Sequence, residues 1–87
     1  MDPVTLTGDQ IAVLRAVAEA QARFGEATTI DVAFVLGRTR PELLNTRRER
    51  LMTQLRRAGA IELVRSGGTS SWRLSDAGRT LLSGLPT

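Results

Sequence analysis

Apolar residues in the first quarter of the chain recur at helical spacing. Between residues 9 and 23 they fall every three or four positions, which places them on one face of an amphipathic helix. Thr7 and Gln10 form a capping-box pair before this segment, and Gly25 is typical of a helix end. We therefore expect a core helix over about 9–23, with an inward stripe of Ile11, Leu14, Val17, Ala18 and Phe24.

A second, shorter apolar segment covers residues 31–37, DVAFVLG. Thr28 and Asp31 suit the start of a helix, because a Thr hydroxyl caps free amide groups and a carboxylate is favoured at the positive helix end. Gly37 is the expected end of this helix. A helix that is apolar all round must lie between other elements, so we expect Phe34 in the core.

Residues 47–58 predict a third helix that is apolar inside and cationic outside. Thr46 and Glu49 have the spacing of a capping box, which would start the helix at about Arg47, and Gly59 would end it. Residues 37–42 contain Gly, Pro and a further Thr-x-x-Glu box, so either a loop or an extra helical turn separates the second and third helices. The expected inward stripe of the third helix consists of Leu44, Leu51, Leu55 and Ala58.

After Gly59 the apolar period changes from helical to alternating, which predicts two strands joined by a tight turn at Gly67-Gly68. We expect Trp72 to be a core residue beside Leu63 rather than a platform on which a base stacks. A last short helix begins after Ser75, and its apolar residues, which close the core, are Leu81, Leu82 and Leu85.

These elements fit one small domain, because 87 residues can bury a single core but not two. We expect one domain over residues 1–87, with an ordered core at about 7–83. The order of elements predicts an α+β fold with three helices, a two-stranded β-hairpin and a short C-terminal helix.

The positive charge is concentrated in the predicted third helix and the turn before it. Residues 38–57 hold seven of the twelve arginines and two acids, a net charge of +5, whereas residues 1–37 hold five acids and two arginines, a net charge of −3. A local positive field of this kind is typical of a surface that binds a polyanion. An arginine-rich face that is merely solvated is the alternative.

The composition argues against most catalytic chemistry. The chain has no Cys and no His, and its carboxylates are scattered singly, so neither a thiolate or imidazole site nor a paired acid/base site is expected. We expect a binding protein rather than an enzyme, without metal or cofactor. The first residues, MDPVTLTGD, lack the basic and apolar character of a signal peptide, and no run is long enough to span a membrane, so a cytoplasmic location is expected.

Two segments resemble known DNA-binding proteins. LMTQLRRAGAIELV is similar to the end of the recognition helix and the first wing strand of MarR-type and PadR-type bacterial transcriptional regulators, and WRLSDAGRTLL is similar to the segment that closes their wing. The resemblance implies a small winged helix-turn-helix domain. It also implies sequence-specific binding of double-stranded DNA, with the third helix in the major groove.

Carried over from Leu55 and Gly59, the resemblance assigns the base-facing turn to Asn45, Thr46 and Arg47, and a further basic contact to Arg50. Two features depart from these families: the interval from Gly37 to Gly59 is longer, and Arg48 stands where they have an apolar anchor. The wing lacks their Asp-x-Arg pattern, which leaves its own arginines for phosphate or minor-groove contacts. The full set of expected DNA-binding residues is Arg38, Arg40, Asn45, Thr46, Arg47, Arg50, Thr53, Arg57, Arg65 and Arg73.

The expected partner is therefore double-stranded DNA, and the expected role is transcription regulation or DNA binding for a phage or mobile element. A homodimer is a candidate assembly, although the flanking helices through which such regulators pair are barely present. No small-molecule effector is evident. The alternative function is a winged-helix adaptor that binds another protein without binding DNA, because a fold does not fix a function.

Overall fold

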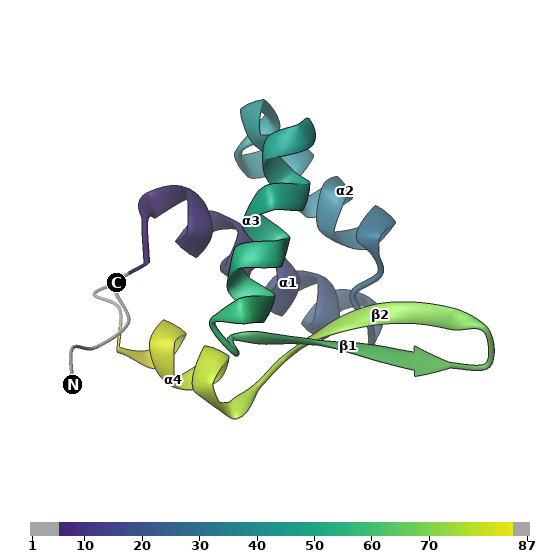
Figure 1. The fold of residues 1–87 in the computed structure, drawn as a ribbon. Helices are drawn as coiled ribbons and strands as arrows, with labels where there is room; N and C mark the ends of the chain where they lie inside the picture. Colours follow the sequence, from purple (N-terminus) through teal and green to yellow (C-terminus); the bar gives the residue numbers. More distant parts are fainter. Residues whose placement is uncertain (1–5, 85–87) are drawn as a thin grey trace.

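The computed structural model describes residues 6–84, apart from the side chains of Thr46 and Ser66. Within these residues the chain forms four α-helices, a 3-10 turn and a two-stranded antiparallel hairpin, so the expected α+β class is confirmed (Figure 1). The expectations for the chain ends, including a core role for Leu85, lie outside the described residues. In order, the elements are α1 (Gly8–Phe24), α2 (Thr29–Thr39), η1 (Pro41–Leu43), α3 (Thr46–Arg57), β1 (Ile61–Ser66), β2 (Thr69–Leu74) and α4 (Asp76–Ser83).

Helix α1 is the scaffold that the sequence predicts. The Thr7 hydroxyl accepts a hydrogen bond from the Gln10 amide, and the Gln10 side chain accepts one from the Thr7 amide, which completes the capping box. Gly25 ends the helix with a φ of 80°. The expected place of Phe24 in the core is wrong: its side chain is 46% exposed, and its ring contacts the exposed Phe34 of α2. The residues that α1 buries are Val13, Leu14, Ala16, Val17 and Ala20.

Helix α2 is longer than predicted and buries only one side. It continues through Gly37 to Thr39, so the expected end at Gly37 is wrong. The expected burial of Phe34 is also wrong, since its side chain is 53% exposed. At 100° per residue Phe34 points almost opposite to the three residues that α2 buries, which are Val32, Val35 and Leu36.

The extra helical turn between α2 and α3 is confirmed as η1. Leu43 in this turn is fully buried and takes the inward place expected for Leu44, which is 39% exposed. Helix α3 is capped by Asn45 rather than Thr46: the Asn45 backbone is extended, as an N-cap requires, and its Oδ1 accepts a hydrogen bond from the Arg47 amide at 2.9 Å. Helix α3 buries Leu51, Met52 and Leu55.

Three glycines shape the segments that flank β1. Gly59, with a φ of 77°, follows the C-cap Ala58, which is exposed rather than part of the inward stripe. The amide of Ala60 then donates to the carbonyl of Leu55 at 2.9 Å, which is the Schellman pattern expected for a glycine-terminated helix. At the hairpin tip Gly67 and Gly68 have φ values of 56° and 86°, which confirms the tight turn.

Strand β2 forms backbone hydrogen bonds along both of its edges. Leu63 pairs with Trp72 across the two strands, as expected, and the Trp72 amide donates to the Ala27 carbonyl at 2.6 Å. Trp72 packs against the core but remains partly exposed, so the prediction of a core residue is only partly right. Its strand β2 packs against α1.

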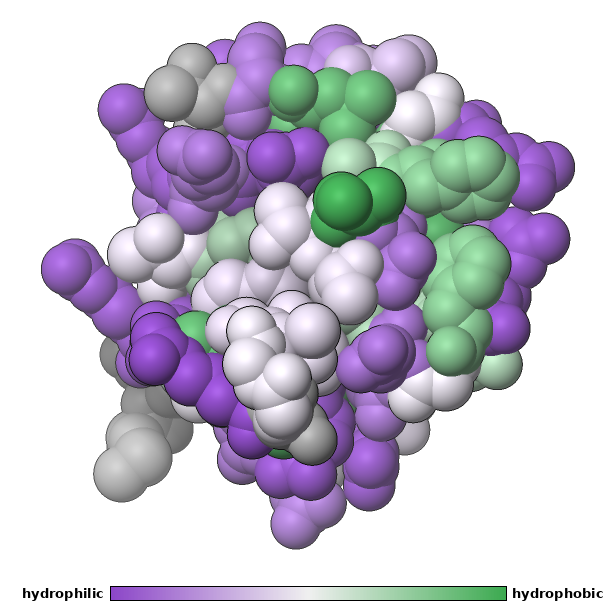
Figure 2. All heavy atoms as spheres, turned by 90° about the vertical axis from the view of Figure 1, so that its right-hand side faces the viewer, coloured by the Kyte–Doolittle hydropathy of each residue, from purple (hydrophilic) through white to green (hydrophobic). Residues whose placement is uncertain are grey.

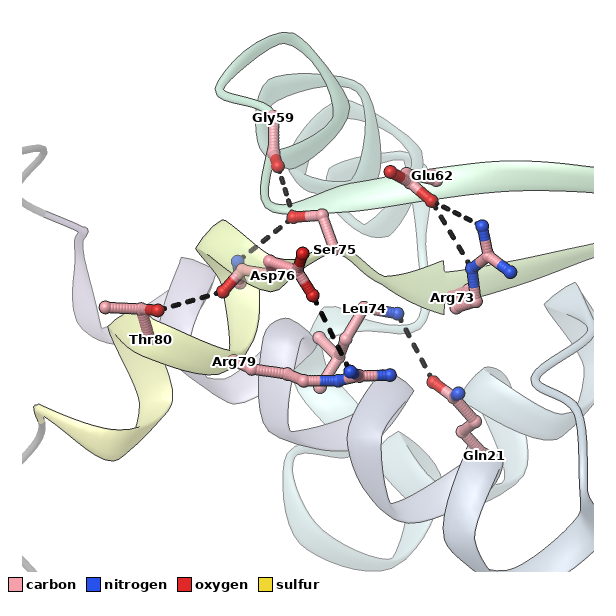
Figure 3. A network of polar contacts seen from close by, with 10 residues as sticks. Gln21, Gly59, Glu62, Arg73, Leu74, Ser75, Asp76, Arg79 and Thr80 are labelled. Carbon is pink, nitrogen blue, oxygen red and sulfur yellow. Dashed lines mark hydrogen bonds and ion pairs between the residues drawn. The ribbon is translucent and has the colours of Figure 1, made fainter.

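Polar contacts fix the base of the hairpin to the helices (Figure 3). The Ser75 hydroxyl donates to the Gly59 carbonyl and accepts from the Gly78 amide, so it links the end of α3 to the start of α4. The Gln21 side chain of α1 accepts a hydrogen bond from the Leu74 amide at 3.2 Å. These bonds tie the base of the hairpin to α1, to the end of α3 and to the start of α4. Among the helices of residues 6–84, none has the length and apolar character needed to cross a bilayer.

Candidate nucleic-acid interface

The outer side of α3 is a ridge of polar residues that faces away from the core. Positions 46, 50, 53 and 57 recur at helical spacing opposite Leu51 and Leu55. The side chains of Arg50, Thr53 and Arg57 on this ridge are exposed. The Thr46 side chain lies outside the described residues, although its backbone begins the helix at this end of the ridge. In Figure 1 this helix stands in front of α1, with the hairpin beside its C-terminal end.

A groove of about 570 Å³ runs beside this ridge, between α3, the first turn of α2 and strand β2. Val32, Met52 and Trp72 supply its apolar surface. Its polar lining combines five side chains of α3 with one from the N-terminus of α2: Arg48, Glu49, Thr53, Arg56 and Arg57, and Thr29. A helix N-terminus and several guanidinium groups around one groove favour an anion such as a phosphate.

The arginines that surround the groove keep their charges unpaired. Arg48, Arg56 and Arg57 form no ion pair with any residue that the structure describes, and the same holds for Arg50 on the ridge. Glu49 is the acid that lines the groove. The positive field therefore remains available to a ligand.

Two of the arginines that were expected to contact DNA, Arg40 and Arg47, instead lie close to Asp9 in the first turn of α1. Arg40 Nη2 lies 2.7 Å from Asp9 Oδ1, and Arg47 Nη1 lies 3.9 Å from Asp9 Oδ2. Arg40 also donates from Nε to Glu42. The hydrogen bond to Glu42 and, after it, the one to Asp9 raise the pKa of Arg40, and the bond from Arg40 lowers the pKa of Glu42. Arg40 therefore links the junction of α2 and η1 to the start of α1, and Arg47 points from α3 toward α1.

The two arginines of the hairpin differ in their surroundings. Arg73 donates to Glu62 at 2.8 Å across the strands and lies on the hairpin face opposite Trp72. Arg65 shares the face of Leu63 and Trp72 and forms no ion pair with a described residue. Of the two, Arg65 is thus on the side of the hairpin that borders the groove.

The remaining expected residues lie at the edge of the site. Asn45 uses its Oδ1 to cap α3, which leaves its side-chain NH₂ group as a free donor. The Arg38 guanidinium lies over the Phe34 ring, 5.9 Å from the ring centroid, on the outer side of α2. Neither residue lines the groove. The structure thus gathers Arg50, Thr53 and Arg57 on one ridge, with Arg65 beyond them on the hairpin.

The set of DNA-binding residues expected from the sequence lacks the arginines on the groove side of α3. Arg48, Met52 and Arg56 are spaced four residues apart and form a second row along the helix, next to the ridge. This spacing is visible in the sequence and could have identified Arg56. The place of Thr29 in the groove could not have been found in this way, since it depends on where the fold puts the start of α2 relative to α3.

Nothing matches this chain among family models, curated proteins or solved structures. Within residues 6–84 no three acidic side chains lie close enough together to suggest a metal site. The assignment of a function therefore rests on the geometry and charge of the α3 ridge and the adjoining groove.

Proposed function

We propose that this chain is a winged helix-turn-helix domain that binds double-stranded DNA in a sequence-specific manner. Helix α3 enters the major groove of the DNA, and the hairpin acts as the wing. The protein's own groove beside α3 receives a phosphate of the DNA backbone. The observation that carries the proposal is the exposed ridge of Arg50, Thr53 and Arg57, flanked by further unpaired arginines. The resemblance of residues 48–82 to MarR-type and PadR-type regulators supports it.

The dimensions of α3 suit this role. An α-helix with its side chains is about 10–12 Å across, and the major groove of B-DNA is about 12 Å wide. The twelve residues of α3 extend over about 18 Å, which allows its first turns to reach base edges while its last turns lie beside the backbone. Asn45, Thr46 and Arg50 are the base-reading residues in this arrangement.

Phosphate contacts come from the groove side of α3 and from the hairpin. Arg56 and Arg57 at the end of the helix, together with Thr29 in the first turn of α2, surround the proposed phosphate position. Arg65 extends the same surface onto the wing. Arginine suits these contacts because its planar guanidinium binds phosphate through two hydrogen bonds.

The biological role in this proposal is regulation of transcription, or DNA binding on behalf of a phage or mobile element. A mobility-shift assay with genomic fragments from either side of its own gene tests it directly. If about four to six phosphates are neutralised, the logarithm of the binding constant should fall with the logarithm of salt concentration with a slope of about −4 to −5.

A protein-binding adaptor is the second candidate, and the exposed apolar side chains on the outer side of α2 favour it. The salt titration separates the two functions. A slope near zero with every DNA fragment would reject the DNA proposal and leave the adaptor.

A further inference from the structure

The large hydrophobic side chains exposed within the described residues gather along the outer side of α2. They are Phe24, Ile30, Phe34 and Leu44, with exposures of 46%, 80%, 53% and 39%. We call these four residues the α2 strip. Figure 2 looks onto this side of the molecule, and green side chains lie together in the upper right of the view.

The members of the α2 strip lie close together on one side of α2. The rings of Phe24 and Phe34 meet edge to face, with centroids 6.2 Å apart and an interplanar angle of 75°. Ile30 lies one helical turn before Phe34. Leu44 lies against Gly37, where an added Cβ would come within 3.3 Å of Leu44 Cδ1. The two rings are thus in contact, and Ile30 and Leu44 extend this apolar surface along α2.

The α2 strip is large for a surface exposed to water. Its two half-exposed rings alone leave about 200 Å² of aromatic surface in solvent, if a whole aromatic side chain offers about 200 Å². With Ile30 and Leu44 the total reaches the range of about 300–600 Å² that is found for the largest, often functional, patches of monomeric proteins. Burial of this apolar surface against another protein surface is therefore energetically favourable.

The charges beside the α2 strip indicate what covers it. Asp31 and Arg38 are seven residues apart, so they lie on the same edge of α2, and Phe34 lies at the midpoint between them. Neither forms an ion pair with a described residue. If a second α2 packs antiparallel across Phe34, Arg38 of each copy faces Asp31 of the other. The edge is thus complementary to itself, as a two-fold interface requires.

We propose that two copies of this chain associate through the α2 strip, with antiparallel α2 helices and the two-fold axis beside Phe34. The two strips and their charged edges bury on the order of 1,000 Å² in total, which is the lower end for a specific interface. A reversible dimer of micromolar affinity is therefore expected. No residue of the α2 strip lines the groove beside α3, so the dimer leaves that groove open. In this assembly Arg38 serves the interface between copies rather than DNA.

Sedimentation equilibrium over a range of concentrations tests the dimer. The unmodified chain should shift from monomer to dimer at micromolar concentration. The Phe34→Ser variant should remain monomeric at protein concentrations at least tenfold higher. Arg15→Glu is the control, because Arg15 is exposed on α1 outside the α2 strip. A chain that stays monomeric at all concentrations, or a dimer that persists unchanged in Phe34→Ser, would overturn the proposal and leave the α2 strip to a different protein.

The charge pattern allows a sharper test. Arg38→Glu and Asp31→Arg should each weaken the dimer about tenfold. In a dimer of either variant, both pairs of facing residues 31 and 38 carry like charges. An equimolar mixture of the two variants should restore dimers, because both opposed pairs then carry opposite charges. Two weakened variants that do not associate with each other would contradict the antiparallel arrangement.

Asp31 also caps α2 through the Thr28 amide, so the melting temperature of Asp31→Arg is measured beside the mixture. If that variant does not fold, Phe34→Cys replaces it: the chain has no other Cys, and oxidation should link two copies through the two-fold axis. Arg15→Cys should not form this link, and equal linking of both variants would reject the interface. The salt slope of DNA binding is measured separately, so failure of the dimer and failure of DNA binding are distinguishable.

Discussion

Asp9 in α1 accepts a hydrogen bond from Arg40 at 2.7 Å, although 31 positions separate the two residues in the sequence. The second carboxylate oxygen of Asp9 lies 3.9 Å from Arg47 at the start of α3. One acid thus restrains two arginines at the edge of the proposed DNA surface. Its charge opposes the approach of phosphate as well.

Asp9→Asn should therefore strengthen DNA binding. Removing the carboxylate frees Arg47 and leaves Arg40 paired with Glu42 alone, so we expect affinity to rise several-fold and the salt slope to steepen by up to about one for each arginine that gains a phosphate. Asp76→Asn is the matched control, because Asp76 also lies in the first turn of a helix and pairs with an arginine, but on α4. Equal affinities for both variants in an anisotropy titration would show that Asp9 has no influence on DNA binding.

Arg50→Ala and Arg57→Ala should weaken DNA binding in different ways. Loss of a bidentate base contact at Arg50 should cost about 1–3 kcal/mol and relax the preference at one base pair in a binding-site selection experiment. Loss of a phosphate contact at Arg57 should weaken all sequences alike and lower the salt slope by about one. Arg15→Ala, which removes the same charge from α1, should change neither the selected sequence nor the salt slope. If Arg50→Ala leaves the selected sequence intact, the base-reading residues are elsewhere on α3.

Arg47→Ala provides a further test of the same surface. The resemblance assigns Arg47 to the base-facing turn, whereas the structure turns its side chain toward Asp9. We therefore expect Arg47→Ala to change the selected sequence less than Arg50→Ala does. A stronger effect at Arg47 would mean that DNA displaces Asp9 from this pair, which the Asp9→Asn titration would report independently.

Trp72→Ala should destabilise the domain by about 2 kcal/mol, which is less than the 3–5 kcal/mol typical of a fully buried ring. The ring packs against the core with one side and borders the groove with the other. Thermal unfolding measures the loss, and Trp72→Phe should recover much of it. A variant that keeps its melting temperature and loses only DNA affinity would favour the alternative in which Trp72 stacks on a base.

Gly78→Ala should destabilise the junction between α4 and the hairpin by about 1–3 kcal/mol. A Cβ on Gly78 would lie 2.1 Å from the carbonyl oxygen of Ala60, so α4 or the start of β1 must move. Gly8→Ala is the control, because Gly8 is also helical and a Cβ there meets no atom within 4 Å. Gly8→Ala should be neutral or slightly stabilising, and a similar loss in both variants would refute the steric explanation.

The sequence by itself determined most of the elements, because the interactions that start and end them are local. The capping pair of Thr7 and Gln10, the left-handed Gly59 and the Gly67-Gly68 turn all involve groups within a few residues of one another. The period of apolar residues likewise distinguished helices from strands. For the site, this local information was sufficient to place Arg50, Thr53 and Arg57 on one exposed face of α3.

Only the tertiary structure decided which surfaces are covered and which charges are paired. The α2 segment is so apolar that its sequence does not distinguish an inner from an outer side, and packing against α1 and η1 left Phe34 exposed. The contact between Asp9 and Arg40 likewise forms because folding brings the start of α1 to the corner after α2. These features depend on neighbours that are distant in the chain, and local propensity contains no information about them.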